Sequence, residues 1–533
     1  MARGTSDIDT EKYRLRRFVE RLIDLDEVEV HDEPVPLTGV SPIIEGTDKA
    51  VLFRQAGPER VELVAKTAGS RRRLAAAFGT SEDAIYDAYY RRLAEPQKIV
   101  EIPSDEAPVH AIALTGRDVD LARLPFHPQH AYDGSCYISS AMDFTVDPAT
   151  GRRNVGCRRL SLRNRCECGT NVTAPSDLKR IYHACVARGE KLPIAFTVGA
   201  HPLDFIAATM RQGDDELALI AQLRGEPAAV VKCLTNDILV PADAEMTLEG
   251  YLDERGYVEP EGPYGEYMGY YGAIHMDPVF HCTAITMRRD VLHLSLLHGS
   301  AHVLDQTDSA NISALRTEAE ALRILRASGR DAAAAHLSTR SGGANNLRIA
   351  MRQRAPGEAR QAILTLFGAL RPVKHIFVFD DDIDIRDEGQ VAWALGTRFQ
   401  AHEDLVVLDG MLGMTMDPSL TGRRTGAKAG FDCTKPLGRA GNIPLTRAAA
   451  RVFDGPARFQ SVEAALAQGP KFYADIVEGV GSDDGRDVAL ALDALRLEGR
   501  LGRDRDGRYS LASAPPGITG IVGELYPDPN EGA

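Results

Sequence analysis

The sequence predicts a multidomain protein of the α+β and α/β classes, with a β-rich centre between an N-terminal α/β lobe and a C-terminal α/β domain. The chain has 533 residues, which is more than one hydrophobic core usually serves. Strand-like segments dominate from about residue 110 to 300, and helical and strand-like segments alternate after about residue 311. We therefore expect four parts: a lobe over 1–115, a β-domain over 116–310, an α/β domain over 311–455 and a helical tail over 456–533.

The N-terminal lobe is expected to begin with an amphipathic helix over residues 12–31, because apolar residues from Leu15 to Leu22 recur at helical spacing. A short β-rich stretch at 50–53 follows, and then a helical region from about 70 to 94. This mixture predicts an α/β lobe.

The central part reads as strands. An apolar-rich segment over 137–146 is followed by the turn Asp-Pro-Ala-Thr-Gly at 147–151 and a return strand over 154–163, which predicts a β-hairpin. Further strands are expected at 193–198, 229–233 and 281–286. Many strands with few helices are typical of a barrel or a sandwich.

The C-terminal part alternates between the two kinds of element, which is the pattern of βαβ units and a parallel sheet. Helices are expected at 311–326, 357–370 and 388–395, and strands at 347–352, 375–380 and 405–408. The tail has helices and then a charged turn over 499–511, and this order resembles a winged-helix unit. Its acidic and basic residues are interspersed, which favours packing or dimerisation over DNA binding.

Composition narrows the function classes. The formal charge of −14 disfavours non-specific binding to nucleic acid or acidic membranes, and no apolar run of about eighteen residues predicts a membrane span. The first residues lack a hydrophobic signal region, and the eight scattered cysteines suit reduced thiols. We expect a cytoplasmic protein that binds neither nucleic acid nor membranes. The pair Cys166 and Cys168 alone is weak support for zinc.

The most informative segment is Glu-Gly-Pro-Tyr-Gly-Glu at 261–266. It places two carboxylates five residues apart in a stretch that Pro263 and two glycines keep out of regular helix or strand. Such a loop can direct both acids into one cleft, and paired carboxylates in unequal environments can supply an acid and a base. The alternative is a solvated acidic turn.

Two other places carry candidate residues. Asn154 and Arg159 lie on the return strand of the hairpin, where an odd separation puts them on opposite faces unless a bulge at Gly156 redirects them. Adjacent arginines at 158 and 159 need carboxylate or phosphate partners. Glu216 starts an apolar helical stretch, where an acid usually caps the helix.

Taken in order, these motifs and several more resemble those of the UbiD family of decarboxylases over roughly residues 12 to 450. Each motif is short, but their common order and spacing make the resemblance specific. The motifs are Asn154–Arg159, Glu216 with Leu223-Arg224-Gly225, Val230–Cys233, Asn236-Asp237, Val240–Ala242, Glu261–Glu266 with Gly269-Tyr270-Tyr271, Phe379–Asp382, Trp393-Ala394 with Thr397-Arg398, and Gly426–Thr434.

The resemblance implies prenylated flavin mononucleotide (prFMN) held in a split β-barrel of the flavin-reductase type, with a divalent metal, usually Mn²⁺, and often K⁺ at its phosphate. Arg159, Glu261 and Glu266 would form the catalytic network, with Glu266 as proton donor. Asn154 and Glu216 would be metal ligands. The residues that would contact the cofactor are Asn154, Cys157, Arg158, Arg159, Ala207, Ala208, Met210, Glu216 and Lys428.

One departure from the family pattern concerns the third metal ligand, which is usually a histidine. The stretch 170–175 has none, and Thr173 falls near that place. Either water, Thr173 or Asn171 fills the position, or the metal site is weaker than in the family, and no third ligand is assigned. His298, His302 and Asp305 are further candidates for the pocket, and two histidines there would favour a polar heteroaromatic or phenolic acid.

The predicted function is reversible, non-oxidative decarboxylation of an aromatic, heteroaromatic or α,β-unsaturated carboxylic acid. The expected partners are this small acid, a prenyl-flavin synthase that supplies the cofactor, and further copies of the chain in a homodimer or larger homo-oligomer. One alternative is an oxidoreductase that uses unmodified FMN. Another is a non-catalytic flavin or metal carrier with an interaction tail, although a carrier has no need of Glu261 and Glu266.

Overall fold

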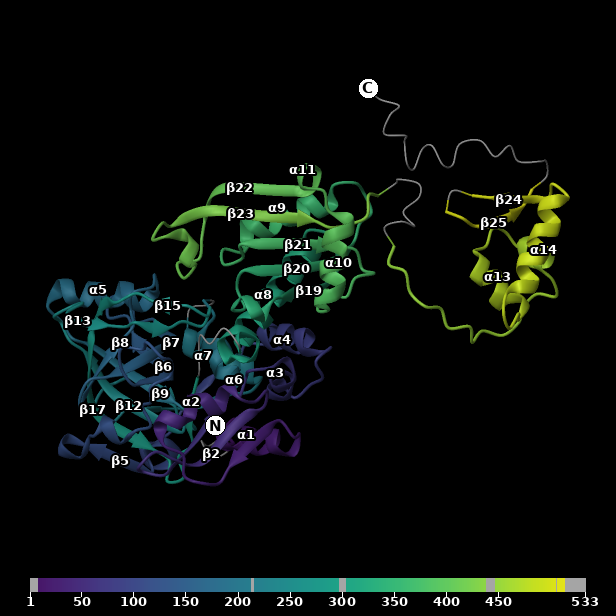
Figure 1. Ribbon diagram of the computed structural model, residues 1–533. Coiled ribbons are helices and arrows are strands. Elements are labelled where there is room, and N and C mark those ends of the chain that lie inside the picture. Colours follow the sequence, from purple (N-terminus) through teal and green to yellow (C-terminus); the bar gives the residue numbers. More distant parts are fainter. Residues whose placement is uncertain (1–7, 212–214, 297–302, 438–445, 505, 513–533) are drawn as a thin grey trace, which may run out of the picture. The chain divides into compact units, whose positions relative to one another are not determined.

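The computed structural model describes residues 8–211, 215–296, 303–437, 446–504 and 506–512 (Figure 1). The chain divides into two compact units. The first comprises residues 1–350, 362–377 and 406–431, and the second comprises 351–361, 378–405 and 432–533. The domain boundaries expected at 115, 310 and 455 remain predictions.

The N-terminal lobe contains a four-stranded sheet of order β1-β2-β3-β18. The helix expected over 12–31 is shorter, because it ends at Asp24, Asp26 adopts a positive φ of 56°, and the chain then enters β1. The elements are α1 (Leu15–Asp24), β1 (Val28–His31), α2 (Leu37–Glu45), β2 (Ala50–Ala56), β3 (Val61–Ala65), α3 (Arg71–Phe78), α4 (Ile85–Ala94) and β18 (His293–Ser295).

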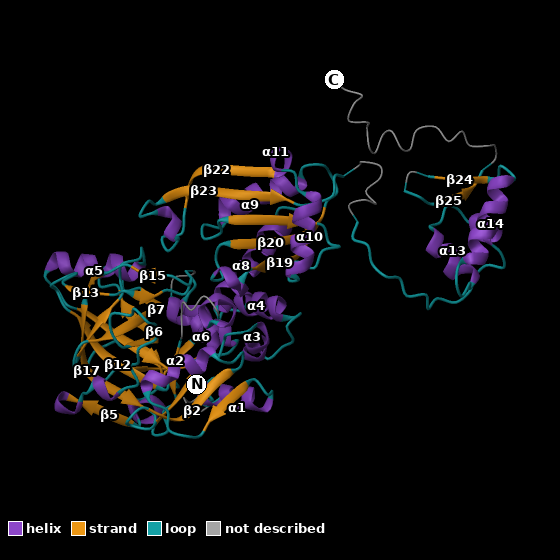
Figure 2. Ribbon diagram, viewed as in Figure 1, coloured by secondary structure: helices purple, strands orange, loops and turns teal. Residues whose placement is uncertain are grey.

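The centre of the first unit is a closed β-barrel (Figure 2). The strand order is β12-β9-β6-β7-β8-β17-β5, and the additional pairing of β12 with β17 joins six strands into a ring, with β5 added outside it. The predicted barrel and the predicted hairpin of β6 and β7 are confirmed. The strands are β5 (Ile112–Thr115), β6 (Tyr137–Val146), β7 (Arg153–Leu162), β8 (Glu167–Thr170), β9 (Leu192–Val198), β12 (Met246–Leu252) and β17 (Val279–Met287).

Alternating apolar residues fill the barrel, among them Leu160, Phe196 and Phe280, all fully buried. The hairpin register has one irregularity, and it lies in β6 between Ile138 and Ala141, next to the part of β7 that carries Arg159. The bulge expected at Gly156 is therefore wrong, since Gly156 pairs regularly with Asp143.

Helices and short hairpins surround the barrel and carry the remaining candidate residues. They are α5 (Asp177–Arg188), α6 (Pro202–Ala208), α7 (Glu216–Arg224), the hairpin of β13 (Glu259–Glu261) with β16 (His275–Asp277), and that of β14 (Tyr264–Gly265) with β15 (Tyr271–Gly272). A small sheet of order β11-β10-β4 contains β4 (Ile99–Glu101), β10 (Ala228–Lys232) and β11 (Leu239–Pro241).

The C-terminal part has a five-stranded sheet of order β19-β20-β21-β23-β22, with the expected helices at nearly the expected positions. The elements are α8 (Asp308–Ala327), β19 (Asp331–Leu337), β20 (Asn346–Arg352), α9 (Glu358–Ala369), β21 (His375–Phe379), α10 (Glu388–Arg398), α11 (Ala401–Asp404), β22 (Leu405–Leu412) and β23 (Thr425–Asp432).

The tail forms its own apolar core around Leu466, Ile476 and Leu492. Its helices α12 (Val462–Leu466), α13 (Tyr473–Val480) and α14 (Arg486–Leu497) precede an antiparallel pair, β24 (Leu501–Arg503) and β25 (Tyr509–Leu511). This is the winged-helix-like order that the sequence predicts. Within the described ranges, no helix is long and apolar enough to cross a membrane.

Candidate active site

Three charged side chains from distant parts of the sequence meet at the barrel. Arg159 lies on β7, Glu261 ends β13, and Glu266 follows β14 directly. Gly262 turns the chain between the two acids with a φ of +93°, a conformation that residues with a Cβ rarely adopt. The loop expected from the glycines and Pro263 therefore directs both carboxylates towards one guanidinium.

The guanidinium of Arg159 binds both acids at once. Its Nε and Nη2 donate to the two carboxylate oxygens of Glu261, both at 2.8 Å, and its Nη1 donates to Glu266 Oε1 at 2.9 Å. Glu261 is 2% exposed and Arg159 9% exposed. A bidentate pair with so little solvent has a fixed geometry, because the donor fork of arginine matches a carboxylate.

The ring of Tyr264 packs against the guanidinium of Arg159. The guanidinium carbon of Arg159 lies 4.2 Å from the centre of its ring, and its hydroxyl is 2.7 Å from Ser139 Oγ and 2.8 Å from Gln129 Oε1. Ser139 belongs to the irregular part of β6. The irregularity thus provides an anchor for the ring on which Arg159 rests.

Gly265 allows the loop to approach its neighbour closely. A Cβ built at this position would lie 2.3 Å from His130 Nδ1. The His130 ring is held by Asp133 at 3.1 Å, and the backbone N–H of Gly265 donates to the same carboxylate at 2.9 Å. Gly265, the second glycine of the motif, is therefore required because any side chain there would clash with His130.

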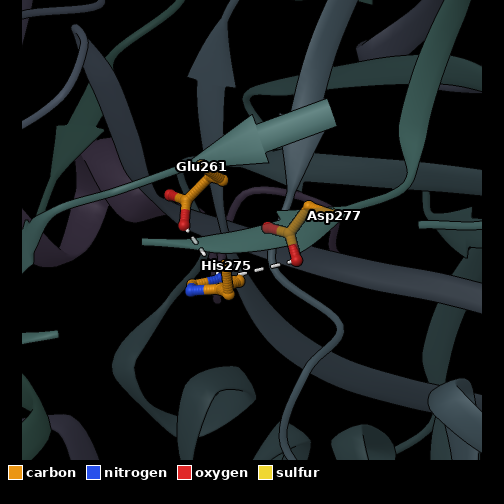
Figure 3. Close-up of side chains that lie close together, drawn as sticks. All are labelled: Glu261, His275 and Asp277. Carbon is orange, nitrogen blue, oxygen red and sulfur yellow. Dashed lines mark ion pairs between the residues drawn. The ribbon is translucent and has the colours of Figure 1, made fainter. Parts of the chain in front are cut away.

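His275 and Asp277 lie next to Glu261 and extend the charged network (Figure 3). Antiparallel pairing puts His275 opposite Glu261, and His275 Nε2 lies 3.1 Å from Glu261 Oε2 and 3.4 Å from Asp277 Oδ1. Burial opposes ionisation of Glu261, but hydrogen bonding to His275 and Arg159 outweighs it and lowers the pKa of Glu261 to about 2. The two carboxylates raise the pKa of His275 to about 10.

Glu261, His275 and Asp277 each present one ligand atom within 4.8 Å of the others, a spacing that would also suit a metal ion. The Nδ1 of His275 lies 3.0 Å from the carbonyl oxygen of Ala273 and donates to it. Arg159 already binds both oxygens of Glu261. If His275 is protonated, the two positive charges of Arg159 and His275 match the two negative charges of Glu261 and Asp277.

A second polar cluster lies along β7. The side-chain amide of Asn154 donates to Asp143 Oδ2 at 3.4 Å, and Glu216 Oε2 accepts from the backbone N–H of Val155 at 2.8 Å. Asp143 is fully buried, which raises its pKa, and its Oδ1 is 3.5 Å from Arg158 Nε. Neither of these two atoms has a hydrogen-bond partner.

Glu216 is the first residue of α7, and it is only 9% exposed. Asp215, and not Glu216, provides the cap by accepting from the N–H of Leu217. The Glu216 carboxylate instead turns to β7, and its pKa is raised by burial. The candidate ligand Glu216 therefore contacts β7 at Val155, directly next to the second candidate ligand, Asn154.

The other candidates for the cofactor site are apolar or backbone contacts. Burial raises the pKa of the Cys157 thiol to about 12, so this cysteine is not a thiolate at neutral pH. Arg158 donates to the carbonyl of Cys157 at 2.7 Å. Ala207 and Ala208 end α6, and these two residues and Met210 are all buried.

Lys428 is not joined to these residues by any contact described. It is buried on β23 and donates to the carbonyls of Leu370 and Arg371, at 3.1 and 3.0 Å, just after α9. Thr173 contacts Asn171 at 2.8 Å. Asp305 pairs with Arg340 at 3.3 Å, and His298 and His302 lie outside the described residues.

Sequence reasoning missed Tyr264, His275, Asp277 and Asp143 as parts of the site. Tyr264 stands inside the Glu-Gly-Pro-Tyr-Gly-Glu motif. His275 and Asp277 alternate as Glu259 and Glu261 do, and this is the pattern of two strands with acidic and basic residues on one face. The prediction of a hairpin over 259–277 would have placed His275 and Asp277 opposite the two glutamates.

Comparison with known proteins agrees with this geometry. Residues 100–301 match the model of the 3-octaprenyl-4-hydroxybenzoate carboxy-lyase Rift-related domain (UbiD), and residues 310–433 match that of the corresponding C-terminal domain (UbiD_C). A protein from Rhodospirillum rubrum, named for the region 5′ of cooM, is 30% identical over 451 residues, which are 83% of this chain and 95% of the relative. Anhydromevalonate phosphate decarboxylase of Methanosarcina mazei is 29% identical over 429 residues, 79% of this chain and 96% of that enzyme.

Solved structures give the same result. HmfF of Pelotomaculum thermopropionicum, a UbiD-class enzyme in complex with FMN, superposes with a TM-score of 0.76 at 29% identity and covers 82% of this chain and 97% of its own. An evolved dimeric form of HmfF in complex with prFMN has a TM-score of 0.73 at 28% identity, with the same two shares. The barrel, the ordered motifs and these matches agree, and the chain belongs to the UbiD family of carboxy-lyases.

Proposed function

We propose that this protein catalyses the reversible, non-oxidative decarboxylation of an aromatic, heteroaromatic or α,β-unsaturated carboxylic acid with prFMN as its cofactor. The observation that carries the proposal is the buried bridge from Glu261 through Arg159 to Glu266. A decarboxylase needs both a carboxylate-binding cation and a proton donor, and Arg159 and Glu266 can supply them.

The residues present suit a flavin phosphate and a hard cation at the β7 cluster. Asn154 and Glu216 offer amide and carboxylate oxygens, which Mn²⁺ and similar ions accept. Arg158 Nε and Asp143 Oδ1 are buried without hydrogen-bond partners, so polar groups here have bonding capacity left for a ligand. We assign Asn154 and Glu216 to the metal, and Cys157, Arg158, Ala207, Ala208 and Met210 to the cofactor, with K⁺ at the phosphate.

The chemistry divides between the cofactor and the chain. When bound, prFMN supplies an electron sink for the bond that breaks as CO₂ leaves. Arg159 binds the substrate carboxylate or holds the two glutamates in place, and Glu266 gives a proton to the carbon that has lost CO₂. Glu261, fixed by two hydrogen bonds, sets the orientation of Arg159.

The assembly we propose is a homodimer or a larger homo-oligomer, with a prenyl-flavin synthase as cofactor supplier. The dimeric form of HmfF supports the first part, and the need for prenylation supports the second. Lys428 belongs to the proposal as a residue near the flavin, and the third metal position is left unassigned.

The test is expression with and without a prenyl-flavin synthase, followed by measurement of CO₂ release from a panel of aryl, heteroaryl and acrylic acids. We expect release only from protein made with the synthase. Activity that needs a nicotinamide donor and no prenylation would instead identify an oxidoreductase that uses unmodified FMN. Loaded protein that releases no CO₂ from any acid of the panel, and fixes none at high bicarbonate, would contradict the proposal.

A further inference from the structure

His275 lies between two carboxylates, an environment that favours a positively charged ring. Its Nδ1–H donates to the carbonyl of Ala273 at 3.0 Å, so in a neutral ring Nε2 would carry a lone pair. That lone pair would face Glu261 at 3.1 Å and Asp277 at 3.4 Å. A lone pair facing two carboxylates would be repelled, so in the absence of an ion between these three residues the arrangement favours a proton on both nitrogens.

Asp277 depends on His275 for its charge. It is fully buried, and neither of its side-chain oxygens has a hydrogen-bond partner. Burial raises its pKa, and His275 opposes that rise. Without the imidazolium, Asp277 would be a buried anion with no counter-charge, and it would repel Glu261 or take up a proton itself, because Glu261 keeps Arg159 as its partner.

We propose that His275, with Asp277 behind it, is a positioning residue that holds the Glu261 carboxylate in its bidentate pairing with Arg159 and so limits how strongly Arg159 binds Glu266. If Glu261 lost this pairing, Arg159 would bind Glu266 more strongly, since it already donates to that carboxylate at 2.9 Å. Stronger pairing would restrict the Glu266 carboxyl group, to which the proposed function assigns the proton transfer. The inference rests on the proposed function of the site.

Other charged groups near His275 support this assignment. Glu261 faces it from β13 and Asp277 from its own strand. Beyond them lie Arg159 on β7, which binds Glu261, and Tyr137 on β6, whose pKa is raised by burial and by the nearby Glu261 carboxylate. The anions thus outnumber the cations around the ring, and the ring retains its proton well above neutral pH.

The experiment compares His275→Gln with a matched control. His281 also bridges two acids, Asp253 at 2.8 Å and Glu167 at 3.2 Å, and its side chain is 23% exposed against 25% for His275. In prFMN-loaded enzyme we expect H275Q to lower kcat by about 10- to 100-fold, the range for loss of one charge-assisted hydrogen bond, with a smaller change in KM. We expect H281Q to change kcat less than threefold.

The double variant H275Q/D277N tests the cause. It removes the cation together with the anion that needs it, so no uncompensated anion is left beside Glu261 and we expect kcat to recover by about tenfold relative to H275Q. A merely structural role predicts further loss in the double variant, and that result would overturn the proposal.

A second measurement does not depend on turnover. In full-length protein labelled with ¹³C at histidine Cε1, the resonance that disappears in H275Q should keep its imidazolium shift from pH 6 to 8.5 and titrate near pH 10. Titration between pH 6 and 7 would overturn the proposal even if decarboxylation is demonstrated. If the decarboxylase proposal fails instead, this resonance still reports whether His275 is the cation described. One equivalent of bound metal lost in H275Q but kept in H281Q would show an ion at Nε2 and would also overturn it.

Discussion

Replacing Arg159 with methionine should loosen the strands that the network joins. The change removes two hydrogen bonds to Glu261 and one to Glu266, all between 2.8 and 2.9 Å. Removing one partner of a buried ion pair costs about 3 to 5 kcal/mol. The drop in the pKa of Glu261 from 4.5 to about 2 corresponds to about 3 kcal/mol, and His275 contributes part of it. We therefore expect a loss of about 2 to 3 kcal/mol at pH 7.

Hydrogen exchange measures this loss locally, without assuming that a multidomain chain unfolds in one step. Amides of β7 and of the β13–β16 hairpin should exchange about 30- to 150-fold faster in R159M, since each 1.4 kcal/mol is a factor of ten. Arg165→Met is the control, because Arg165 pairs with Asp120 at 3.0 Å on the surface and such pairs contribute about 0 to 1 kcal/mol.

The pH dependence provides an independent check of the cause. The pKa of Glu261 is lower in the folded protein, so its stabilising contribution is complete above pH 4.5 and is lost as the pH falls from 4.5 to about 2. The difference between R159M and wild type should shrink over that window after correction for intrinsic exchange rates. Exchange in both segments within threefold of wild type at pH 7, or a difference that does not change with pH, would refute the reasoning.

Three further predictions concern single residues of the site. Glu266→Gln should lower turnover by about 10²- to 10⁴-fold, the usual contribution of a general acid, while flavin content measured by absorbance stays near wild type; unchanged turnover would exclude Glu266 as proton donor. Asn154→Ala should lower bound metal and bound flavin together, as measured by elemental analysis and absorbance on the same sample, and full retention of both would remove Asn154 from the ligand set. Gly265→Ala should destabilise the protein by about 1 to 3 kcal/mol, because its Cβ would lie 2.3 Å from His130 Nδ1, whereas Gly368→Ala, which meets nothing within 4 Å, should not lower the melting temperature.

The sequence predicted the parts of the site that depend on short motifs. Arg159 lies 102 and 107 residues from Glu261 and Glu266, and their convergence was expected because the motifs resemble those of one family in order and spacing. The β6–β7 hairpin was also predictable, since its turn residues and apolar strands are adjacent in the chain.

The parts that sequence reasoning missed depend on pairing between segments. The expected helix over 12–31 ends at Asp24, because the next residues pair with β2, which periodicity in one segment does not reveal. The irregularity expected at Gly156 lies in β6, next to the strand position of Arg159, where Ser139 meets the hydroxyl of Tyr264. His275 contributes through its register opposite Glu261, and that register is fixed only when the hairpin forms.

The pairing of β12 with β17 has a consequence for how this enzyme can vary. A ring of strands has no free end at which one member could slide, so a shift in any pair would have to be shared by all six. The register of Arg159 relative to the loop that carries the two glutamates is therefore fixed by all six strands of the barrel and not by β7 alone. Insertions within these strands should therefore abolish activity wherever they fall, and so should insertions in the segment between β12 and β17 that carries the two glutamates, whereas changes of length in the other connections leave the spacing of Arg159, Glu261 and Glu266 intact and provide the room in which new substrate preferences can arise.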